Sequence, residues 1–214
     1  MFNFSRISVL SSFGHEINNL LVTNDTESDH LLALFPGMYN TCESPLLYYA
    51  REAALQAGCD VLGIQYGYSR AGVDFSPEMF APTLEETLEA LRLCGFEKYR
   101  RISFISKSFG TLIAGEAAKR FPTAGIRHLF LTPISSSIPY IAGTDCTVIY
   151  GTADPHFTQN DAAQIADDPR VKLHALPGAD HSLESRTDYR DSLRVLAKIC
   201  GIYEDFLKLI CSGR

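Results

Sequence analysis

The chain has 214 residues, of which 46% are hydrophobic and 21% are charged, and this composition is typical of a folded globular protein. Its 25 acidic residues outnumber its 19 basic residues, and the formal net charge of -6 provides no basic field for nucleic acid or an anionic membrane. The first residues, "MFNFSRISVL", lack the basic and apolar regions of a signal peptide. We therefore expect one cytoplasmic domain over residues 1–214 with a small-molecule substrate, no nucleic-acid or membrane partner, and an oligomeric state that the sequence leaves open.

The six cysteines form no C-x-x-C pair and have no spacing typical of a zinc site. Most of them lie in apolar stretches, where a reduced cysteine acts as a small hydrophobic residue. The sequence therefore predicts reduced, mostly buried thiols and no metal site. The six are Cys42, Cys59, Cys94, Cys146, Cys200 and Cys211.

The first elements in chain order are two strands, "RISVLSS" and "INNLLVTN", which the turn "FGHE" joins into a hairpin. The next strand, "LLALFPG", is continuously apolar and typical of a strand that is buried on both faces of a sheet. A helix is expected from Ser44, followed by a proline at the first helical position, to Gly58. After strand "DVLGIQYG", a second helix is expected to begin at Thr83, which forms a T-x-x-E capping box with Glu86, and to end at Gly95.

From residue 101 onward, strands and helices alternate regularly. Strand "RISFIS" precedes a helix over 109–120, strands "HLFLTPI" and "CTVIYG" precede a helix near 160–167, and strand "VKLHALPG" precedes a final amphipathic segment. This alternation predicts parallel strands joined by right-handed crossovers. The expected fold is α/β, a three-layer sandwich with a mostly parallel sheet, helices on both faces and an antiparallel N-terminal hairpin. The functional site of such a sheet lies at the carboxyl ends of its strands.

Two serines lie between small residues directly after a predicted strand, Ser108 in "SKSFG" and Ser69 in "GYSRA". A nucleophile elbow needs small residues two positions before and after its serine, because the strand and the following helix pass closely there. Only Ser108 precedes an uninterrupted helical run, "FGTLIAGEAAKRF", whereas the residues after Ser69 predict a loop. Ser108 is therefore the candidate nucleophile, while a serine helix cap is the alternative that explains this residue by itself.

A carboxylate and a histidine follow later strands, Asp154 after "TVIYG" and His181 after "VKLHALPG". The chain order serine, carboxylate, histidine is the order expected when the three members of a hydrolytic triad meet at one edge of the sheet. Asp180 is the second candidate for the acid. Because adjacent side chains on a loop seldom face each other, we expect Asp180 to bind local backbone instead.

On these residues the chain resembles the α/β-hydrolase superfamily, in particular its small esterases and dienelactone-hydrolase-like members, from about Ile17 to the C-terminus. The resemblance implies an oxyanion hole formed by the backbone N–H groups of Met38, in "LFPGMYN", and Phe109. Pro36 stands at the position where the superfamily usually has a histidine. The hydrogen-bond donor of this loop is a backbone N–H group, so the absence of the histidine does not remove it. Superfamily members often carry a lid after the sixth strand, and "SSSIPYIAGTD" is too short to form one.

The sequence thus predicts a serine hydrolase that cleaves a small carboxylic ester through an acyl-enzyme, without a cofactor or a metal. Tyr39, Tyr68, Arg70 and Lys107 are candidate substrate-binding residues, and the two cations would favour a substrate that carries a carboxylate. Two alternatives stay open at this point. They are a thioesterase or peptidase on the same triad, and a non-catalytic binding protein with this fold.

Overall fold

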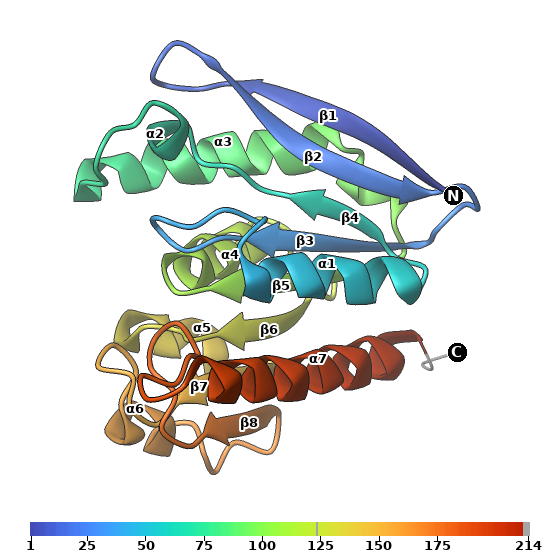
Figure 1. The fold of residues 1–214 in the computed structure, drawn as a ribbon. Helices are drawn as coiled ribbons and strands as arrows, with labels where there is room; N and C mark the ends of the chain where they lie inside the picture. Colours follow the sequence, from blue (N-terminus) through green and yellow to red (C-terminus); the bar gives the residue numbers. More distant parts are fainter. Residues whose placement is uncertain (123, 212–214) are drawn as a thin grey trace.

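The computed structural model describes residues 1–122 and 124–211, and a single eight-stranded sheet forms its centre (Figure 1). The strands lie side by side in the order β1-β2-β4-β3-β5-β6-β7-β8. β1 (Phe2–Leu10) and β2 (Glu16–Asn24) form an antiparallel hairpin at one edge, and β2 also pairs antiparallel with β4 (Asp60–Gly63). The other neighbours pair in parallel, through β3 (His30–Phe35), β5 (Arg101–Lys107), β6 (Arg127–Leu131), β7 (Cys146–Gly151) and β8 (Val171–Leu176). The predicted α/β architecture with its N-terminal hairpin is confirmed.

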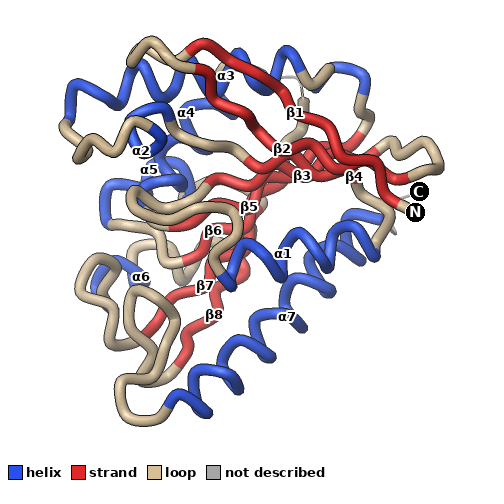
Figure 2. Tube along the Cα trace, turned by 45° about the horizontal axis from the view of Figure 1, so that its top comes forward, coloured by secondary structure: helices blue, strands red, loops and turns tan. Residues whose placement is uncertain are grey.

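Helices cover both faces of the sheet (Figure 2). α1 (Pro45–Gln56) and α7 (Tyr189–Cys211) pack against each other on one face, and α3 (Phe80–Leu93) and α4 (Phe109–Lys119) pack on the other. Shorter helices lie in the connections: α2 (Gly67–Arg70), α5 (Ile138–Ile141) and α6 (Gln159–Ala163), with 3₁₀ turns over Pro77–Met79, Phe96–Lys98 and Ser135–Ser137. No helix in the described part of the chain is long and apolar enough to cross a membrane.

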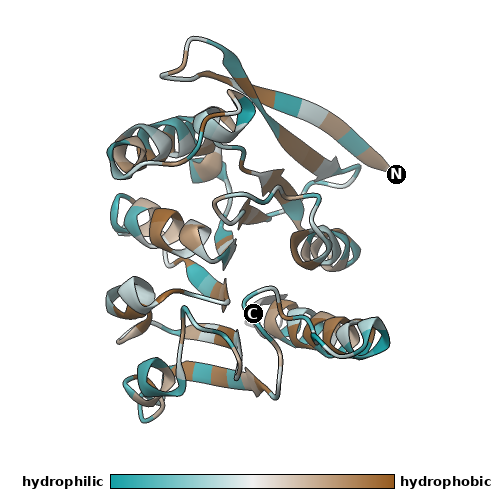
Figure 3. Cartoon of the chain, turned by 60° about the vertical axis from the view of Figure 1, so that its left-hand side comes forward, coloured by the Kyte–Doolittle hydropathy of each residue, from teal (hydrophilic) through white to brown (hydrophobic). Residues whose placement is uncertain are grey.

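The amphipathic pattern of α7 explains why this helix docks on the sheet. Ile199, Tyr203, Phe206 and Leu207 recur at helical spacing, and all four are buried in one cluster with α1 and the adjacent strands. Figure 3 shows α7 with its hydrophobic side towards the sheet and its hydrophilic side outward. Each such side chain contributes about 1.5–3 kcal/mol on burial. The Tyr203 hydroxyl also donates to the carbonyl of Leu46, which joins α7 to α1 at 3.0 Å.

The helix predicted from Thr83 begins earlier, at Phe80, and the predicted capping box is wrong. Glu86 is buried, and its carboxylate accepts hydrogen bonds from the backbone N–H groups of Ser12 (2.7 Å) and Gly67 (3.3 Å). These distant donors replace the local partner that a capping box needs. Glu86 therefore joins the hairpin turn and α2 to α3.

Other boundaries also differ from those predicted. β4 ends at Gly63 rather than near residue 67, and α6 ends at Ala163 rather than near residue 167. The segment after β4 contains α2, so Ser69 lies in a short helix rather than in the predicted loop. Its backbone does not have a positive φ, which distinguishes it from Ser108.

Cys42, Cys59, Cys94 and Cys146 are buried and Cys200 is half-buried, and none of these five forms a disulfide. The side chain of Cys211 lies outside the described residues. Burial raises the pKa of Cys42 to about 12 and that of Cys94 to about 11. These two thiols therefore stay protonated at neutral pH and are poor nucleophiles.

Two buried histidines make the stability of the fold dependent on pH. Burial lowers the pKa of His30 and of His128 from 6.5 to about 4, so both rings are neutral in the folded chain. Between pH 6.5 and pH 4 the unfolded chain binds more protons than the folded chain. The free energy of unfolding therefore falls as pH falls from about 6.5 to about 4. At pH 5 each histidine is expected to cost about 2 kcal/mol of unfolding free energy relative to neutral pH.

Replacing one of these rings tests the expectation. His128 packs against Phe104 and Phe130, so phenylalanine suits the site, and His128→Phe is expected to make the free energy of unfolding less dependent on pH between 6.5 and 4. Urea denaturation at a series of pH values measures this, with the exposed His156→Gln as the control. An unchanged pH dependence in His128→Phe would contradict the expectation.

Candidate active site

Ser108 forms a strained turn between the end of β5 and the start of α4. Its backbone has φ 51° and ψ -121°, in the positive-φ range that non-glycine residues seldom adopt, at a cost on the order of 1–3 kcal/mol. The N–H of Ser108 donates to the carbonyl of Leu131 on β6 at 3.0 Å, which holds the turn against the sheet. A Cβ atom at Gly110 would lie 2.4 Å from the carbonyl oxygen of Pro36, so only glycine fits there. The turn has the geometry of a nucleophile elbow.

A continuous chain of hydrogen bonds joins Ser108, His181 and Asp154. Ser108 Oγ lies 2.8 Å from His181 Nε2, and His181 Nδ1 lies 2.8 Å from Asp154 Oδ2. An ionised carboxylate can only accept, so Nδ1–H donates to Asp154 and Nε2 accepts from the serine hydroxyl. In this tautomer the ring is ready to take the serine proton.

The surroundings of Asp154 fix its carboxylate. Its side chain is fully buried, and Oδ1 accepts a hydrogen bond from the backbone N–H of His156 at 2.8 Å. A Cβ atom at Gly151 would lie 2.1 Å from the carbonyl oxygen of Ala179, so the glycine allows the loops that carry Asp154 and His181 to approach closely. Both oxygens of Asp154 are thereby held, one by the backbone and one by the imidazole.

Asp180, the other candidate acid, has its hydrogen-bond partners within its own loop. Its Oδ1 accepts from the backbone N–H groups of Ser182 (2.8 Å) and Glu184 (3.3 Å), and its Oδ2 pairs with Arg186 at 3.4 Å. The carboxylate therefore orders the loop that carries His181.

The loop after β3 passes directly beside Ser108. A Cβ atom at Gly37 would lie 3.5 Å from Ser108 Cβ, so the segment that continues into Met38 passes close to Ser108. The hydroxyl of Tyr66 donates to the carbonyl of Pro36 at 3.0 Å, and that of Tyr68 donates to the carbonyl of Met38 at 2.9 Å. Two buried tyrosines thus fix the orientation of this loop.

Two backbone N–H groups near Ser108 are available as hydrogen-bond donors. In the described part of the chain, the N–H groups of Met38 and Phe109 donate to no protein acceptor. Met38 lies in the loop after β3, and Phe109 is the first residue of α4, where N–H groups have no intrahelical partner. A developing negative charge beside Ser108 could accept from both.

The candidate substrate-binding residues have different surroundings from one another. Tyr39 is exposed at 71% next to the Met38 loop, and Arg70 is exposed and lines a cavity of about 290 Å³ together with Pro36, Asn40 and Tyr66. Tyr68 is buried, and its hydroxyl is used by Met38. The hydroxyl therefore supports the loop that carries Met38, and a role of Tyr68 in binding substrate stays a prediction.

Lys107 also differs from its expected position at the mouth of the site. Only 7% of its surface is exposed, and its Nζ donates to the main-chain carbonyl of His181 at 3.4 Å. Burial holds the pKa of its ammonium below the ordinary value. The ammonium therefore bonds to the loop that carries His181 rather than extending into solvent, and a role of Lys107 in binding substrate stays a prediction.

Sequence reasoning missed the role of Tyr66, which lies three residues after the end of β4 and directly before α2. No strand period relates it to Tyr68, because Tyr68 lies within α2, and their common role depends on tertiary packing. The two rings stack with centroids 5.7 Å apart, and Phe109 packs edge-on against both.

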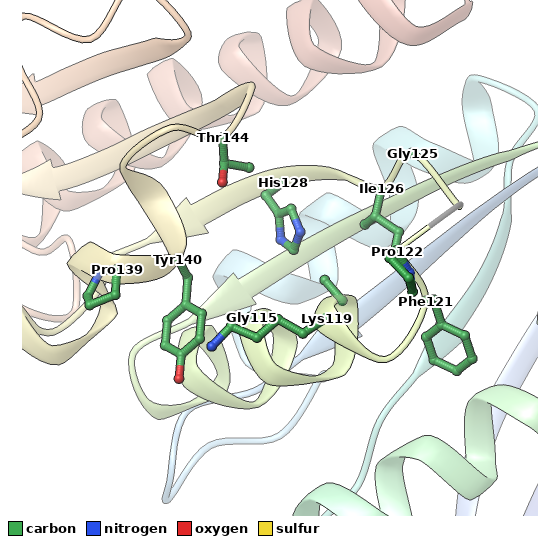
Figure 4. Close-up of a pocket in the computed structure, with 11 residues that line it drawn as sticks. Gly115, Lys119, Phe121, Pro122, Gly125, Ile126, His128, Pro139, Tyr140 and Thr144 are labelled. Carbon is green, nitrogen blue, oxygen red and sulfur yellow. The ribbon is translucent and has the colours of Figure 1, made fainter.

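Other features that resemble sites lie away from this centre. His30 Nε2 lies 2.9 Å from Ser103 Oγ, but both residues are buried near the amino ends of β3 and β5. A cavity of about 340 Å³ lies between α4 and α5 over His128 and is lined by no residue of the Ser108 centre (Figure 4). Within residues 1–122 and 124–211, no group of three histidine, cysteine, aspartate or glutamate side chains could hold a metal ion.

Comparisons with known proteins rest on structure, because no protein-family model and no curated protein matches the sequence. An esterase from Pyrococcus furiosus aligns with a TM-score of 0.71 and 14% identity over 98% of this chain and 93% of that chain. A dienelactone hydrolase from Anabaena variabilis aligns with a TM-score of 0.70 and 14% identity over 98% of both chains. An α/β serine hydrolase without a lid from Xanthomonas campestris aligns with a TM-score of 0.68 and 13% identity over 96% of this chain and 94% of that chain. The chain has the α/β-hydrolase fold.

The α/β-hydrolase fold accounts for the meeting of residues that are far apart in the sequence. β5, β7 and β8 are parallel, so the segments that follow them end at the same edge of the sheet. Ser108, Asp154 and His181 each follow one of these strands. Their mutual distances follow from this topology.

Proposed function

We propose that this protein is a serine hydrolase that cleaves a small carboxylic ester through a covalent acyl-enzyme. The observation that carries the proposal is the hydrogen-bonded chain from Ser108 through His181 to Asp154, which begins on a strained elbow. A serine that only caps a helix needs neither a buried carboxylate nor a histidine within 2.8 Å of its hydroxyl. The fold of the three compared hydrolases supports the same interpretation.

In the first step, Ser108 Oγ attacks the ester carbonyl carbon while its proton moves to His181 Nε2. The carbonyl oxygen becomes an oxyanion that accepts from the N–H groups of Met38 and Phe109. Asp154 stabilises the imidazolium through Nδ1–H. The tetrahedral intermediate then expels the alcohol, which takes the proton from His181, and an acyl ester on Ser108 remains.

Water completes the reaction. His181 takes a proton from the water molecule, whose oxygen attacks the acyl carbon, and a second oxyanion forms in the same position. Collapse of this intermediate breaks the bond to Ser108 Oγ, which regains a proton from His181. The products are a carboxylic acid and free enzyme, and every proton passes through His181, which exchanges protons with Ser108, the departing alcohol and water.

Covalent labelling with a fluorophosphonate probe tests the proposal, because this reagent reacts with activated serines. We expect one probe equivalent by intact mass, located by peptide mapping on the segment that contains Ser108, and no labelling of Ser108→Ala. Ser69→Ala is the matched control and is expected to react like the wild type. A wild-type protein that takes up no probe would instead be a binding protein with this fold.

Arg70 is the basis of a further proposal about substrate choice. Its guanidinium is exposed at the edge of the 290 Å³ cavity beside Pro36, and no ion pair involves it in the described part of the chain. We expect an ester that carries a carboxylate to be preferred over a neutral ester of the same length. For an exposed cation this preference in kcat/KM is about two- to five-fold.

The measurement compares kcat/KM for the two esters in the wild type and in Arg70→Met, at low and high salt. The preference is expected to disappear in Arg70→Met and to weaken at high salt. Arg120→Met, which removes another exposed arginine at the end of α4, is the control. Equal preference in the wild type and Arg70→Met would refute the role of Arg70.

A further inference from the structure

Lys107 is a buried cation beside the candidate nucleophile. It is the last residue of β5, it directly precedes Ser108, and only 7% of its surface is accessible to solvent. In the described part of the chain, no carboxylate lies within ion-pairing distance of its ammonium, and its one hydrogen bond is to the carbonyl of His181. A buried charge without a close ion pair is costly, so another residue type would be more stable here.

Three carboxylates interact electrostatically with the ammonium without forming an ion pair. They are Asp154, which holds the His181 ring, and Asp180 and Glu184, which lie close to His181 in the sequence. Arg186 is paired with Asp180 and neutralises part of that negative charge, but its side chain is 80% exposed. The ring of His156 packs edge-on against the ring of His181, with 4.7 Å between the ring centroids. Lys107 is therefore a buried positive charge at the loop that carries His181, and it interacts with the carboxylate of Asp154.

We propose that Lys107 is a positioning residue for the base. From the end of β5, it holds the main chain of His181 through the carbonyl and places a positive charge near the Asp154–His181 pair. The inference rests on the proposed hydrolase function, in which His181 is the base.

Two consequences follow from this position. The hydrogen bond links the strand that carries Ser108 to the loop that carries His181, although the two bonded residues are 74 positions apart. Loss of the bond would let the imidazole move relative to Ser108 Oγ, and displacement of a catalytic group by about 1 Å can cost about 100-fold in rate. The positive charge also opposes protonation of the imidazole, so its removal makes the imidazolium form more favourable.

The test uses Lys107→Met, which removes both the charge and the donor at similar length, Lys107→Gln as a second neutral variant, and Lys107→Arg, which keeps both. For the neutral variants we expect kcat to fall by about ten-fold or more. We also expect the acid limb of their kcat/KM profile to move to higher pH, by about half a pH unit or more. Lys107→Arg is expected to keep the position of the acid limb. Lys172→Met, which removes an exposed lysine of β8, is the matched control and is expected to leave rate and profile unchanged.

NMR titration of the His181 ring supplies a readout that does not depend on activity. Its protonation midpoint is expected to rise in both neutral variants, while their melting temperatures show that the fold is retained. If the neutral variants titrate like the wild type in both measurements, Lys107 does not act on the base and the inference is wrong. A rate loss at all pH values with an unmoved acid limb would likewise assign Lys107 a purely structural role.

Failure of the hydrolase proposal is distinguishable, because the wild type would then neither react with the probe nor turn over an ester, whereas the NMR comparison would still report on Lys107.

Discussion

Ser108→Ala is expected to reduce hydrolysis of an activated ester such as p-nitrophenyl acetate by about six orders of magnitude in kcat. The substitution removes the nucleophilic oxygen and leaves His181, Asp154 and the backbone donors in place. Alanine keeps the Cβ atom, so the strain of the positive φ persists and the melting temperature is expected to stay close to that of the wild type. Steady-state kinetics and differential scanning calorimetry measure the two quantities.

Ser69→Ala is the control for this experiment, because Ser69 also lies between small residues but is part of the short helix α2. Its turnover is expected to equal that of the wild type. The assignment of the nucleophile would be wrong if Ser69→Ala lost activity while Ser108→Ala kept it.

Asp154→Asn is expected to lower kcat by about four orders of magnitude, because an amide at this position favours the wrong imidazole tautomer. Nδ1 of His181 lies 2.8 Å from Asp154 Oδ2, and the amide NH₂ group would donate to it. Nε2 would then carry the proton and could not accept one from Ser108. The measurement is kcat for the same ester at a pH where the wild-type rate is maximal.

Asp180→Asn is the matched comparison, since Asp180 is adjacent to His181 but bonds to the backbone of its own loop. We expect its kcat to stay within about ten-fold of the wild type, because only loop order is affected. Equal losses in the two variants, or a larger loss in Asp180→Asn, would identify Asp180 as the acid.

Periodic sequence signals predicted most of the fold because they report on local structure. The alternation of apolar strands with amphipathic helices after residue 101 determines a parallel sheet, and the ends of parallel strands meet at one edge. The positions of Ser108, Asp154 and His181 after β5, β7 and β8 could therefore be predicted from the amino-acid sequence alone. The small residues around Ser108 also predicted that the strand and the following helix pass close to each other at this turn.

Some side chains have hydrogen-bond partners that lie far away in the sequence and that the sequence did not indicate. Glu86 fits a local capping box, but its carboxylate is bound by the N–H of Ser12, 74 residues away. Lys107 and Tyr68 are polar residues at strand ends, which favoured a place on the substrate side. In the structure their polar ends bond to main-chain carbonyls of His181 and Met38. No sequence period reports which way such a side chain turns, because the choice depends on tertiary packing.

The positive backbone φ of Ser108 has a consequence for efforts to make this protein more heat-resistant. In the described part of the chain, the non-glycine residues with positive φ are Ser108, Thr132 and Leu183, and they lie in the elbow, at the end of β6 and two residues after His181. Glycine relieves this kind of strain, so a directed-evolution library selected for thermal tolerance alone would favour glycine at these positions. Such a selection would eliminate the proposed nucleophile, Ser108, while stabilising the fold. Screening of this protein for thermostability therefore requires a simultaneous selection for turnover.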